Sequence, residues 1–328
     1  MKDQLTQSGF IKLRWLVGGF VALTGFAVAT LTLWPTKSSA LQQAHFKRLD
    51  YSQSVASINQ QLQQETSKPG LRPECRSIFK THNRKTAKAV LLIHGVSSCP
   101  YYAKGLAEYF YQQGYNVYAP RVPKHGYTDN KRHGEISIKD MGNYVNTSAE
   151  QISGLGDEVG VVGHSGGGTM ATWLLEYGGG LFSRGLLLAP FYEPSAKMLP
   201  KWQVPYFRTA YGYNLVPDKF TADSGLSYRA LAKYVLMKES YRKDLQAPGV
   251  KRIAVVTSES DDAIDADLAR GIPQAIAKTS RASFDYHRLP KSLNINHNLG
   301  LDKPNEKMSQ NLYQHYFDLY AGRPTDSW

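Results

Sequence analysis

The stretch Val159–Tyr177, VGVVGHSGGGTMATWLLEY, constrains the fold of this 328-residue chain more than any other segment. Four mostly β-branched or small residues, typical of a buried strand, lead into a group of glycines around Ser165, and a helix-like segment follows. Ser165 either stands at the tip of a sharp turn or is a small residue in a flexible loop. The stretch alone leaves both interpretations open.

The same alternation of strand and helix continues through most of the chain after residue 89. Short apolar runs that fit strands cover residues 89–94, 115–120, 159–162, 185–190, 251–258 and 282–289. Segments of helical character lie between them, the clearest being 101–113, 137–153 and 263–278. This spacing predicts an α/β fold with a mostly parallel central sheet and helices on both faces.

A long insertion separates two of the predicted strands. Residues 191–250 are rich in Tyr, Pro and Lys and then become helical. A connection of this length is too long for a simple loop, and long insertions are typically functional. We therefore expect a cap over the C-terminal edge of the sheet.

An uncharged segment near the N-terminus predicts a membrane anchor. Trp15–Trp34 has no charge over 20 residues, about the length that crosses a ~30 Å hydrocarbon core. Because Lys12 and Arg14 precede it, the positive-inside rule places the N-terminus in the cytoplasm and the following domain outside it, in the periplasm or an equivalent extracytoplasmic space. The alternatives are a secretory signal cleaved near Ala40, which would release the domain, and a buried core helix.

These features divide the chain into four regions. Helical composition in 35–72, interrupted by TSKPGLRPE, is interpreted as a tether with a solvated, glutamine-rich face. The predicted regions are a cytoplasmic tail (1–14), a transmembrane anchor (15–34), the tether (35–72) and a main domain (73–328) that carries the cap at 191–250.

The formal net charge of +12 could indicate nucleic acid, an anionic membrane surface or simply a basic protein. The sequence has no Lys/Arg-rich block of five to eight residues and no nucleic-acid-binding motif, so we expect no nucleic-acid partner. Contact with anionic lipid fits the predicted anchor better.

The two cysteines, Cys75 and Cys99, could form one disulfide in an exported domain or remain two buried thiols. There is no CxxC motif and no Cys/His spacing typical of a zinc site. We therefore expect no metal and no cofactor.

Gly163–Gly167 matches the pattern G-x-S-x-G between a strand and a helix, the context of a nucleophile elbow. Small residues on either side of the serine let the strained turn close. The helix that follows supplies a backbone N–H at Gly166 for developing negative charge. A strand ending in His94 lies about 70 residues earlier, and Val96 in the turn after it is the best-placed second donor. His94 itself is expected to be structural or orienting.

An acid and a base are expected later in the chain, in that order. Asp261 and Asp262 follow the predicted strand at 251–258, and because adjacent side chains point apart only one can face a histidine. We favour Asp261 as the acid and expect Asp262 to cap the next helix. Of the later histidines, His297 lies in a polar loop that can reach the serine, whereas His287 lies inside a strand; we favour His297 as the base.

The order of His-Gly, GHSGG, a late Asp and a loop His resembles the α/β-hydrolase superfamily over roughly residues 75–321. The cap and the stretch APRVPKHG are similar to its serine carboxylesterase and monoacylglycerol-lipase-like branch. This resemblance implies Ser165 as nucleophile, His297 as base, Asp261 as acid, and Val96 and Gly166 as oxyanion donors.

The resemblance also implies an activity, that of a serine esterase or lipase-like hydrolase. The aromatic, basic cap beside the predicted membrane anchor suggests an amphipathic acyl ester, such as a monoglyceride or lysolipid, as the substrate. The same catalytic groups would serve an acyltransferase, or an amidase or peptidase. A non-catalytic membrane-anchored binding protein is the remaining alternative.

Overall fold

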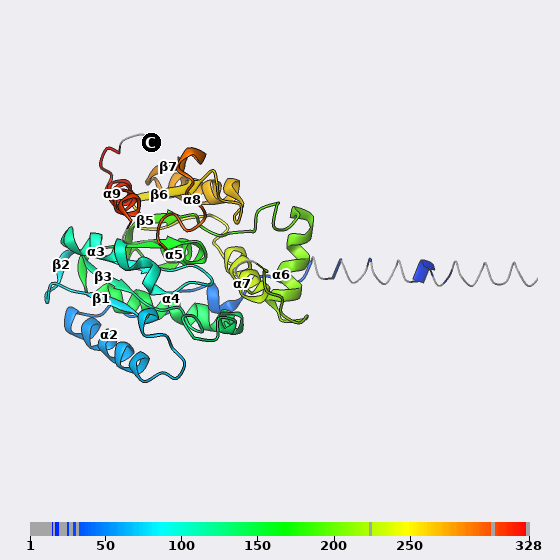
Figure 1. Ribbon diagram of the computed structural model, residues 1–328, viewed down its shortest axis with the longest axis horizontal. Coiled ribbons are helices and arrows are strands. Elements are labelled where there is room, and N and C mark those ends of the chain that lie inside the picture. Colours follow the sequence, from blue (N-terminus) through cyan, green and yellow to red (C-terminus); the bar gives the residue numbers. More distant parts are fainter. Residues whose placement is uncertain are drawn as a thin grey trace, which may run out of the picture.

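The computed structural model describes residues 15, 17–19, 25, 29–30, 33–222, 225–302 and 306–325. The strands, in chain order, are β1 (Ile78–Lys80), β2 (Thr86–Ile93), β3 (Asn116–Ala119), β4 (Gly156–His164), β5 (Phe182–Leu188), β6 (Arg252–Ser258) and β7 (Ser283–Leu289). They form one sheet in the order β1-β3-β2-β4-β5-β6-β7 (Figure 1). β1 is antiparallel to β3, and every other neighbouring pair is parallel.

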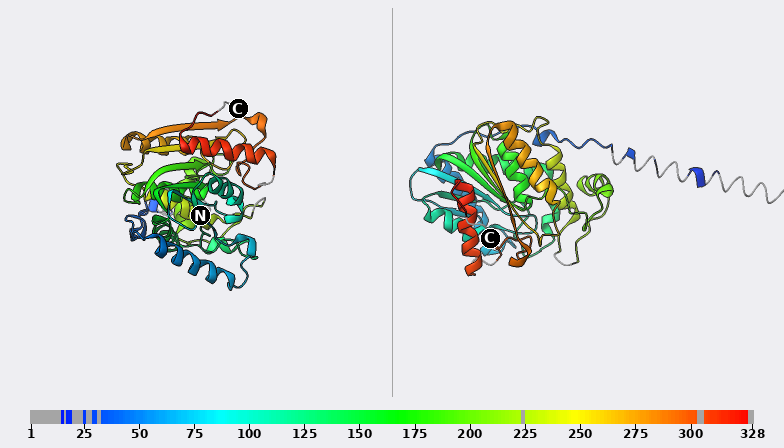
Figure 2. Two further views of the ribbon diagram at one scale, coloured as in Figure 1. Left: turned by 90° about the vertical axis from the view of Figure 1, so that its left-hand side faces the viewer. Right: turned by 90° about the horizontal axis from the view of Figure 1, so that it is seen from above.

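Helices cover both faces of this sheet. They are α2 (Tyr51–Thr66), α3 (Lys104–Gln112), α4 (Ile138–Ser153), α5 (Gly166–Tyr177), α6 (Val204–Gly212), α7 (Tyr228–Glu239), α8 (Ala266–Ser280) and α9 (Lys307–Ala321). α3 and α9 contact each other, whereas α4 and α5 contact each other and the central strands. The views in Figure 2 show α9 and α8 on opposite faces of the sheet. The predicted α/β class, with a mostly parallel sheet between two layers of helices, is confirmed.

The continuous apolar runs of the sequence form the buried strands. A parallel sheet covered on both faces excludes water from both sides of each strand, so apolar residues are favoured at every position. In β2 and β4 the residues toward the C-terminal end are buried almost without interruption. The edge strand β1 was not predicted. Its three residues are only half-buried and too few to show an alternating pattern.

The region predicted as a solvated tether instead packs on the domain. Asp50 caps α2 in a reciprocal capping box with Gln53, and the helix contacts α4. Ile58 is fully buried. Glu65, at the other end of α2, is also buried, and its carboxylate lies 3.3 Å from the guanidinium of Arg121. The helix is held by this buried face, because a helix of this length gains most of its stability from tertiary packing.

The predicted membrane anchor at 15–34 lies largely outside the described residues. Within the part of the chain that the structure does describe, no helix is both long and apolar enough to cross a membrane. Just after the predicted cleavage position at Ala40, Leu41 is fully buried, and its carbonyl accepts a 2.8 Å hydrogen bond from the indole of Trp173.

The predicted cap corresponds to a helical pair between β5 and β6. A 3-10 turn, η5 (Lys201–Gln203), leads into α6, and α6 packs on α7. α7 in turn contacts α5, the helix that follows Ser165. The cap is therefore joined to the sheet through the helix nearest to the predicted nucleophile.

A disulfide joins Cys75 and Cys99, whose Cα atoms are 5.2 Å apart and whose positions are separated by 24 residues. Both cysteines are buried, and they cluster with Leu71 and Tyr127. The disulfide thus connects the segment after α2 to the loop that follows β2.

We expect the double substitution Cys75→Ala and Cys99→Ala to lower the free energy of unfolding by about 3 kcal/mol, because the crosslink restricts the unfolded chain. For a domain of this size, Tm should fall by about 6–12 °C. Thermal unfolding of the parent with and without reductant is the matched control. A parent Tm that reductant leaves unchanged would contradict the prediction.

Stability should also depend on Glu176, a carboxyl group in α5 with 1% of its surface exposed. Burial raises the pKa of Glu176 to about 8, despite a hydrogen bond from the backbone N–H of Arg242. Because the folded-state pKa lies above the unfolded one, its contribution is fully present below about pH 4.5 and is lost as pH rises through about 8.

We therefore expect Glu176→Gln to be more stable than the parent at pH 9, by on the order of 3 kcal/mol, and to differ little at pH 5. Urea unfolding of both proteins from pH 5 to pH 9 measures this difference. The prediction is wrong if the two stability curves run parallel over that range.

Candidate active site

The predicted elbow is a sharp turn between β4 and α5. Ser165 has φ 53° and ψ −120°, outside the regions that L-residues ordinarily occupy. Its backbone is held on both sides, because its N–H donates to Leu188 and its carbonyl accepts from the N–H groups of Gly168 and Phe191. Strain of this kind persists only where the surrounding structure fixes it, and such residues cluster at active sites.

The glycines around Ser165 are required by close packing. A Cβ atom on Gly166 would lie 2.5 Å from Cγ2 of Val96 and 2.8 Å from the ring of Tyr234. On Gly167 it would collide with the backbone carbonyl of Ile93, and on Gly163 with the backbone of Gly167. The glycine-rich sequence therefore lets the turn pack directly against the end of β2.

The structure brings Ser165, His297 and Asp261 into one hydrogen-bonded chain. Nε2 of His297 lies 2.8 Å from Oγ of Ser165, and Nδ1 lies 2.8 Å from Oδ2 of Asp261. The other carboxylate oxygen, Oδ1, accepts from the N–H of Ala263 at 2.8 Å. All three side chains follow the C-terminal ends of β4, β6 and β7, where functional groups gather in sheets of this kind.

The two adjacent aspartates, Asp261 and Asp262, differ in the solvent exposure of their side chains. The Asp261 side chain is 1% exposed, whereas that of Asp262 is 66% exposed and forms an ion pair with Lys197. Asp262 does not cap α8; the side chain of Asp265 does, by accepting from two N–H groups of the first turn. His287 lies within β7 with its ring against that of His315, as expected of a residue inside a strand.

The loop after β2 places Gly95 and Val96 beside the elbow. A Cβ atom on Gly95 would lie 3.1 Å from the Cβ atom of Ser165. The side chain of Val96 packs against Gly166 so closely that no Cβ atom would fit there. The N–H of Gly166 belongs to the first helical residue of α5, where backbone donors lack an intrahelical partner. Both predicted oxyanion donors therefore belong to segments that adjoin the serine.

His94 connects the loop after β2 to the loop after β3 through two hydrogen bonds. Its Nε2 accepts from the N–H of Val122 at 3.0 Å, and Nδ1–H donates to the carbonyl of Gly95 at 2.9 Å. Burial lowers the pKa of His94 to about 4, so the ring is neutral at pH 7. The expectation of a structural or orienting role agrees with these contacts.

A third histidine holds the loop that carries His297. His164 is buried next to Ser165, and its Nε2–H donates to the backbone carbonyl of His297 at 2.9 Å. Burial, followed by repulsion from a charged His297, lowers the pKa of His164 to about 3. The ring of His164 is therefore neutral at pH 7 and remains able to donate this hydrogen bond. The sequence offered no signal for this role, because any residue satisfies the second position of G-x-S-x-G.

A cavity of about 660 Å³ opens above Ser165 and His297. Its floor comes from the elbow and the loops after β2, β6 and β7, and its roof comes from the cap. The apolar side chains that line the roof are Phe191, Met198, Phe220, Leu226, Tyr228 and Leu231. The sequence predicted a cap here but not these residues, since no motif marks them within the insertion.

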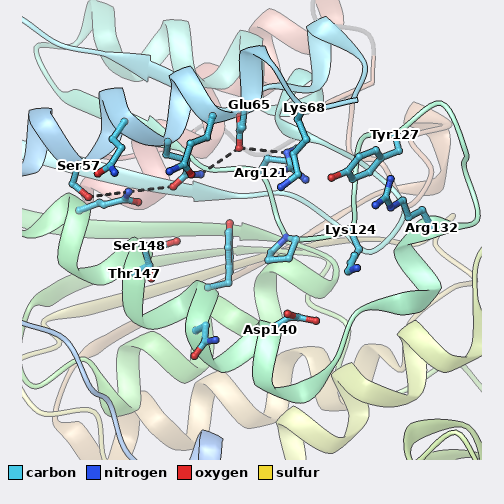
Figure 3. A pocket seen from close by; sticks show the side chains of 17 residues that line it. Ser57, Glu65, Lys68, Arg121, Lys124, Tyr127, Arg132, Asp140, Thr147 and Ser148 are labelled. Atoms are coloured by element: carbon cyan, nitrogen blue, oxygen red, sulfur yellow. Dashed lines mark hydrogen bonds and ion pairs between the residues drawn. The ribbon is translucent and has the colours of Figure 1, made fainter. Parts of the chain in front are cut away.

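A second cavity, of about 570 Å³, lies between α2 and α4 (Figure 3). Its wall is polar, with Ser57 from one helix and Thr147 and Ser148 from the other, and it contains the Glu65–Arg121 ion pair. No histidine or cysteine occurs among the described residues that line it. Its described lining lacks the serine–histidine pair that lies in the first cavity.

Within the described residues there is no cluster of three or more His, Cys, Asp or Glu side chains that could hold a metal ion. The polar groups at the site are a serine hydroxyl, an imidazole, a carboxylate and adjacent backbone N–H donors, a set of groups that acyl transfer can use.

Comparisons with known proteins agree with this architecture. The chain is similar to a structure of the metagenome-derived lipolytic enzymes LipS and LipT at 17% identity and a TM-score of 0.55, over 76% of this chain and 99% of that one. It is also similar to monoglyceride lipase from Saccharomyces cerevisiae (13% identity, TM-score 0.54, 76% and 92% covered) and to Paleococcus ferrophilus monoacylglycerol lipase (14%, 0.55, 75% and 97%).

No curated protein matches the sequence. A model of the alpha/beta hydrolase family, however, matches residues 90–324, which span every strand from β3 to β7 and the Ser165, Asp261 and His297 positions. The resemblance inferred from His-Gly, GHSGG and the late Asp and His is confirmed at the level of the family: the chain belongs to the alpha/beta hydrolases.

Proposed function

We propose that the protein is a serine carboxylester hydrolase of the esterase or lipase type. The observation that carries this proposal is the unbroken chain from Asp261 through His297 to Ser165, with both contacts at 2.8 Å, beneath an apolar roof. Family membership and the lipolytic enzymes among similar structures support it.

In the proposed reaction, Nε2 of His297 takes the proton of Ser165 as Oγ attacks the ester carbonyl carbon. The backbone N–H groups of Val96 and Gly166 hold the oxyanion, and Asp261 keeps His297 in the tautomer that accepts at Nε2. The imidazolium then protonates the leaving alcohol. Water, activated by the same His297, hydrolyses the acyl-enzyme and regenerates Ser165.

For the substrate we propose an amphipathic acyl ester such as a monoglyceride or lysolipid. The cavity volume of about 660 Å³ lies within the range of small-molecule sites, and its apolar roof suits an acyl chain. Two of the similar structures are monoglyceride lipases.

We further propose that residues 15–34 anchor the protein in a membrane with the catalytic domain exported. The uncharged segment and the disulfide, which is typical of oxidising compartments, both favour this location.

The test is hydrolysis of nitrophenyl esters with acyl chains of two to twelve carbons, with product analysis in the presence of an alcohol. We expect hydrolysis to rise toward medium chains, since each buried methylene contributes about 0.8 kcal/mol. Transfer to the alcohol in preference to water would favour the acyltransferase alternative. Cleavage of amides but not esters would favour the amidase or peptidase alternative.

A further inference from the structure

The second cavity, of about 570 Å³ between α2 and α4, has no role in the proposed ester hydrolysis; we call it the α2–α4 cavity. Among the described residues, it shares no lining side chain with the cavity above Ser165, and its volume also lies within the range of small-molecule sites. Such sites are ordinarily lined by apolar side chains. Of the 17 side chains drawn in Figure 3, however, only three are neither charged nor end in an amide or an aliphatic hydroxyl. The lining therefore indicates a polar occupant.

Cationic side chains gather at one end of the α2–α4 cavity. Figure 3 shows Lys68, Lys124 and Arg132 at the end near Tyr127. Lys68 is exposed and forms no ion pair within the described part of the chain. Lys124 and Arg132 share one carboxylate, that of Glu135, at 3.4 Å and 3.8 Å, and the Glu135 side chain is 57% exposed. One exposed carboxylate does not neutralise two cations, so this end of the cavity remains positive.

The two carboxylates that line the α2–α4 cavity are already engaged. Glu65 lies 3.3 Å from the guanidinium of Arg121 and accepts from the N–H and the hydroxyl of Ser77. Asp140 accepts from the N–H and the hydroxyl of Ser137 at the start of α4. Because Glu65 balances Arg121, the three cations near Tyr127 outnumber the remaining carboxylates. The cavity therefore keeps a net positive charge that attracts an anion.

The structure holds two of these cations in fixed positions. Lys124 has φ 69°, in the left-handed region that residues with long side chains seldom adopt. Nη1 of Arg121 donates to the carbonyl of His125 at 3.1 Å and so fixes the turn that carries Lys124. The guanidinium of Arg132 lies 3.9 Å from the centre of the Tyr127 ring, where the aromatic face attracts it. Lys124 and Arg132 are thus positioned by their surroundings.

Amide and hydroxyl groups line the rest of the α2–α4 cavity. The side chains of Gln60, Gln64, Asn143 and Thr147 line it and make no hydrogen bond to other described residues. An amide both donates and accepts, and therefore matches hydroxyl groups, which also do both. Gln151 is 3% exposed, and its Oε1 is buried in the cavity wall without a donor among the described side chains or backbone. Buried amide oxygens of this kind are uncommon in folded proteins.

This lining argues against two other kinds of anionic ligand. A nucleotide base would need an aromatic face on which to stack. The guanidinium groups of Arg121 and Arg132 already lie over the Tyr127 ring, and Tyr144 is 6% exposed, with its hydroxyl bonded to the carbonyl of Pro120. An acidic peptide would need apolar subsites, but the described lining has one aliphatic residue, a proline. An acidic sugar fits both parts of the cavity.

We infer that the α2–α4 cavity binds an acidic sugar. Its carboxylate or phosphate group lies at Lys68, Lys124 and Arg132, where charge-assisted hydrogen bonds hold it. Its hydroxyl groups lie along the free amides of α2 and α4. This site gives a role to the glutamine-rich face of α2, which ester hydrolysis does not use.

Isothermal titration calorimetry of the full chain in detergent micelles tests this inference. Trigalacturonate and N-acetylmuramic acid carry a carboxylate, and glucose 6-phosphate carries a phosphate. Maltotriose is the neutral sugar control, and citrate is the control for an anion that is not a sugar. We expect at least one acidic sugar to bind about tenfold or more tightly than both controls, because only it satisfies the cations and the amides together. The preference between carboxylate and phosphate identifies the acidic group.

Three results of this titration would overturn the inference. If citrate binds as tightly as the acidic sugars, the cavity recognises charge alone. If maltotriose does so, the cations take no part in binding. If none of the three acidic sugars binds, the cavity is not a site for this class of ligand. Absence of ester hydrolysis would overturn the proposed function but leave all of these measurements unaffected.

The position of the site is tested with the double substitution Lys68→Gln and Lys124→Asn, since asparagine tolerates the left-handed backbone at Lys124. Lys278→Gln with Lys307→Gln is the matched control, because it removes the same charge from exposed lysines of α8 and α9. We expect the first pair to weaken binding of the acidic sugar about tenfold or more, and the control pair by less than about twofold. A similar loss in both pairs, or a loss in neither, would place the sugar outside this cavity.

The amide end is tested separately with Asn143→Leu combined with Thr147→Val. This pair keeps the size of both side chains and removes their hydrogen-bonding groups. We expect binding of the acidic sugar to weaken about fivefold or more, with Tm of the variant close to that of the parent. Unchanged binding would contradict the recognition of sugar hydroxyls at this end.

Discussion

Ser165→Ala should abolish ester hydrolysis, with kcat falling on the order of 10⁶-fold, and should remove covalent labelling by a fluorophosphonate. The serine supplies the oxygen that attacks the carbonyl, and its Oγ is the atom 2.8 Å from Nε2 of His297. Alanine keeps the Cβ atom and therefore the same backbone strain at φ 53°. The change thus removes the nucleophile while leaving the turn as it was. Steady-state hydrolysis of a nitrophenyl ester and gel detection of the label measure both effects.

Far-UV circular dichroism and Tm of the Ser165→Ala variant serve as the control and should match those of the parent. Ser195→Ala provides a second comparison, because Ser195 is also buried but only bonds the backbone of Asp262 and of Met198. Its activity should remain within an order of magnitude of the parent. Labelling that survives Ser165→Ala would mean that the elbow is only a glycine-rich turn.

Asp261→Asn should lower kcat by about 10⁴-fold, whereas Asp262→Asn should change it by less than about threefold. Asp261 accepts from Nδ1–H of His297 and from the N–H of Ala263, so an amide in its place must lose one of these acceptors. With an NH₂ group toward Nδ1, His297 would take the tautomer that carries its proton on Nε2. That tautomer cannot accept the proton of Ser165.

Asp262 is a stringent control because it has the same side chain as Asp261 in a different environment. The side chain of Asp262 is exposed at the edge of the cavity, and its carboxylate forms an ion pair with Lys197 instead of a histidine contact. Steady-state kinetics of the two variants from pH 6 to pH 9 separates the roles. A loss of activity in Asp262→Asn larger than that in Asp261→Asn would reverse the assignment of the acid.

The order of strands and helices could be predicted from local pattern because the sheet is parallel and buried. Such strands appear in the sequence as continuous apolar runs, and the run at 89–94 lies largely within β2. The edge strand β1 and the packing of α2 on the domain were not predicted. α2 has a buried side that includes Ile58, but the helix also contains many glutamines. Its pattern of polar and apolar residues therefore did not distinguish a docked helix from a solvated one.

The candidate nucleophile could be predicted from a single stretch because every requirement of the elbow is local. The strand, the glycines and the helix that shape the backbone at Ser165 are all within a few residues of it. His297 and Asp261 depended on the order of residues along the chain, which left His287 and Asp262 as rivals. His164 and the apolar roof of the cavity carried no local signal.

The amino-acid sequence alone determined the class of fold, the order of the strands and helices along the chain and the serine at the turn. These features depend on hydrophobic periodicity and backbone sterics, which act over short distances along the chain. The folded chain alone selected Asp261 over Asp262, brought His297 to a serine 132 positions away and set Tyr213 of the cap beside Trp34. Each of these depends on the direction of a side chain relative to an element that is distant in sequence. Such directions are fixed only when the layers pack, since packing is what determines which face of each element is buried.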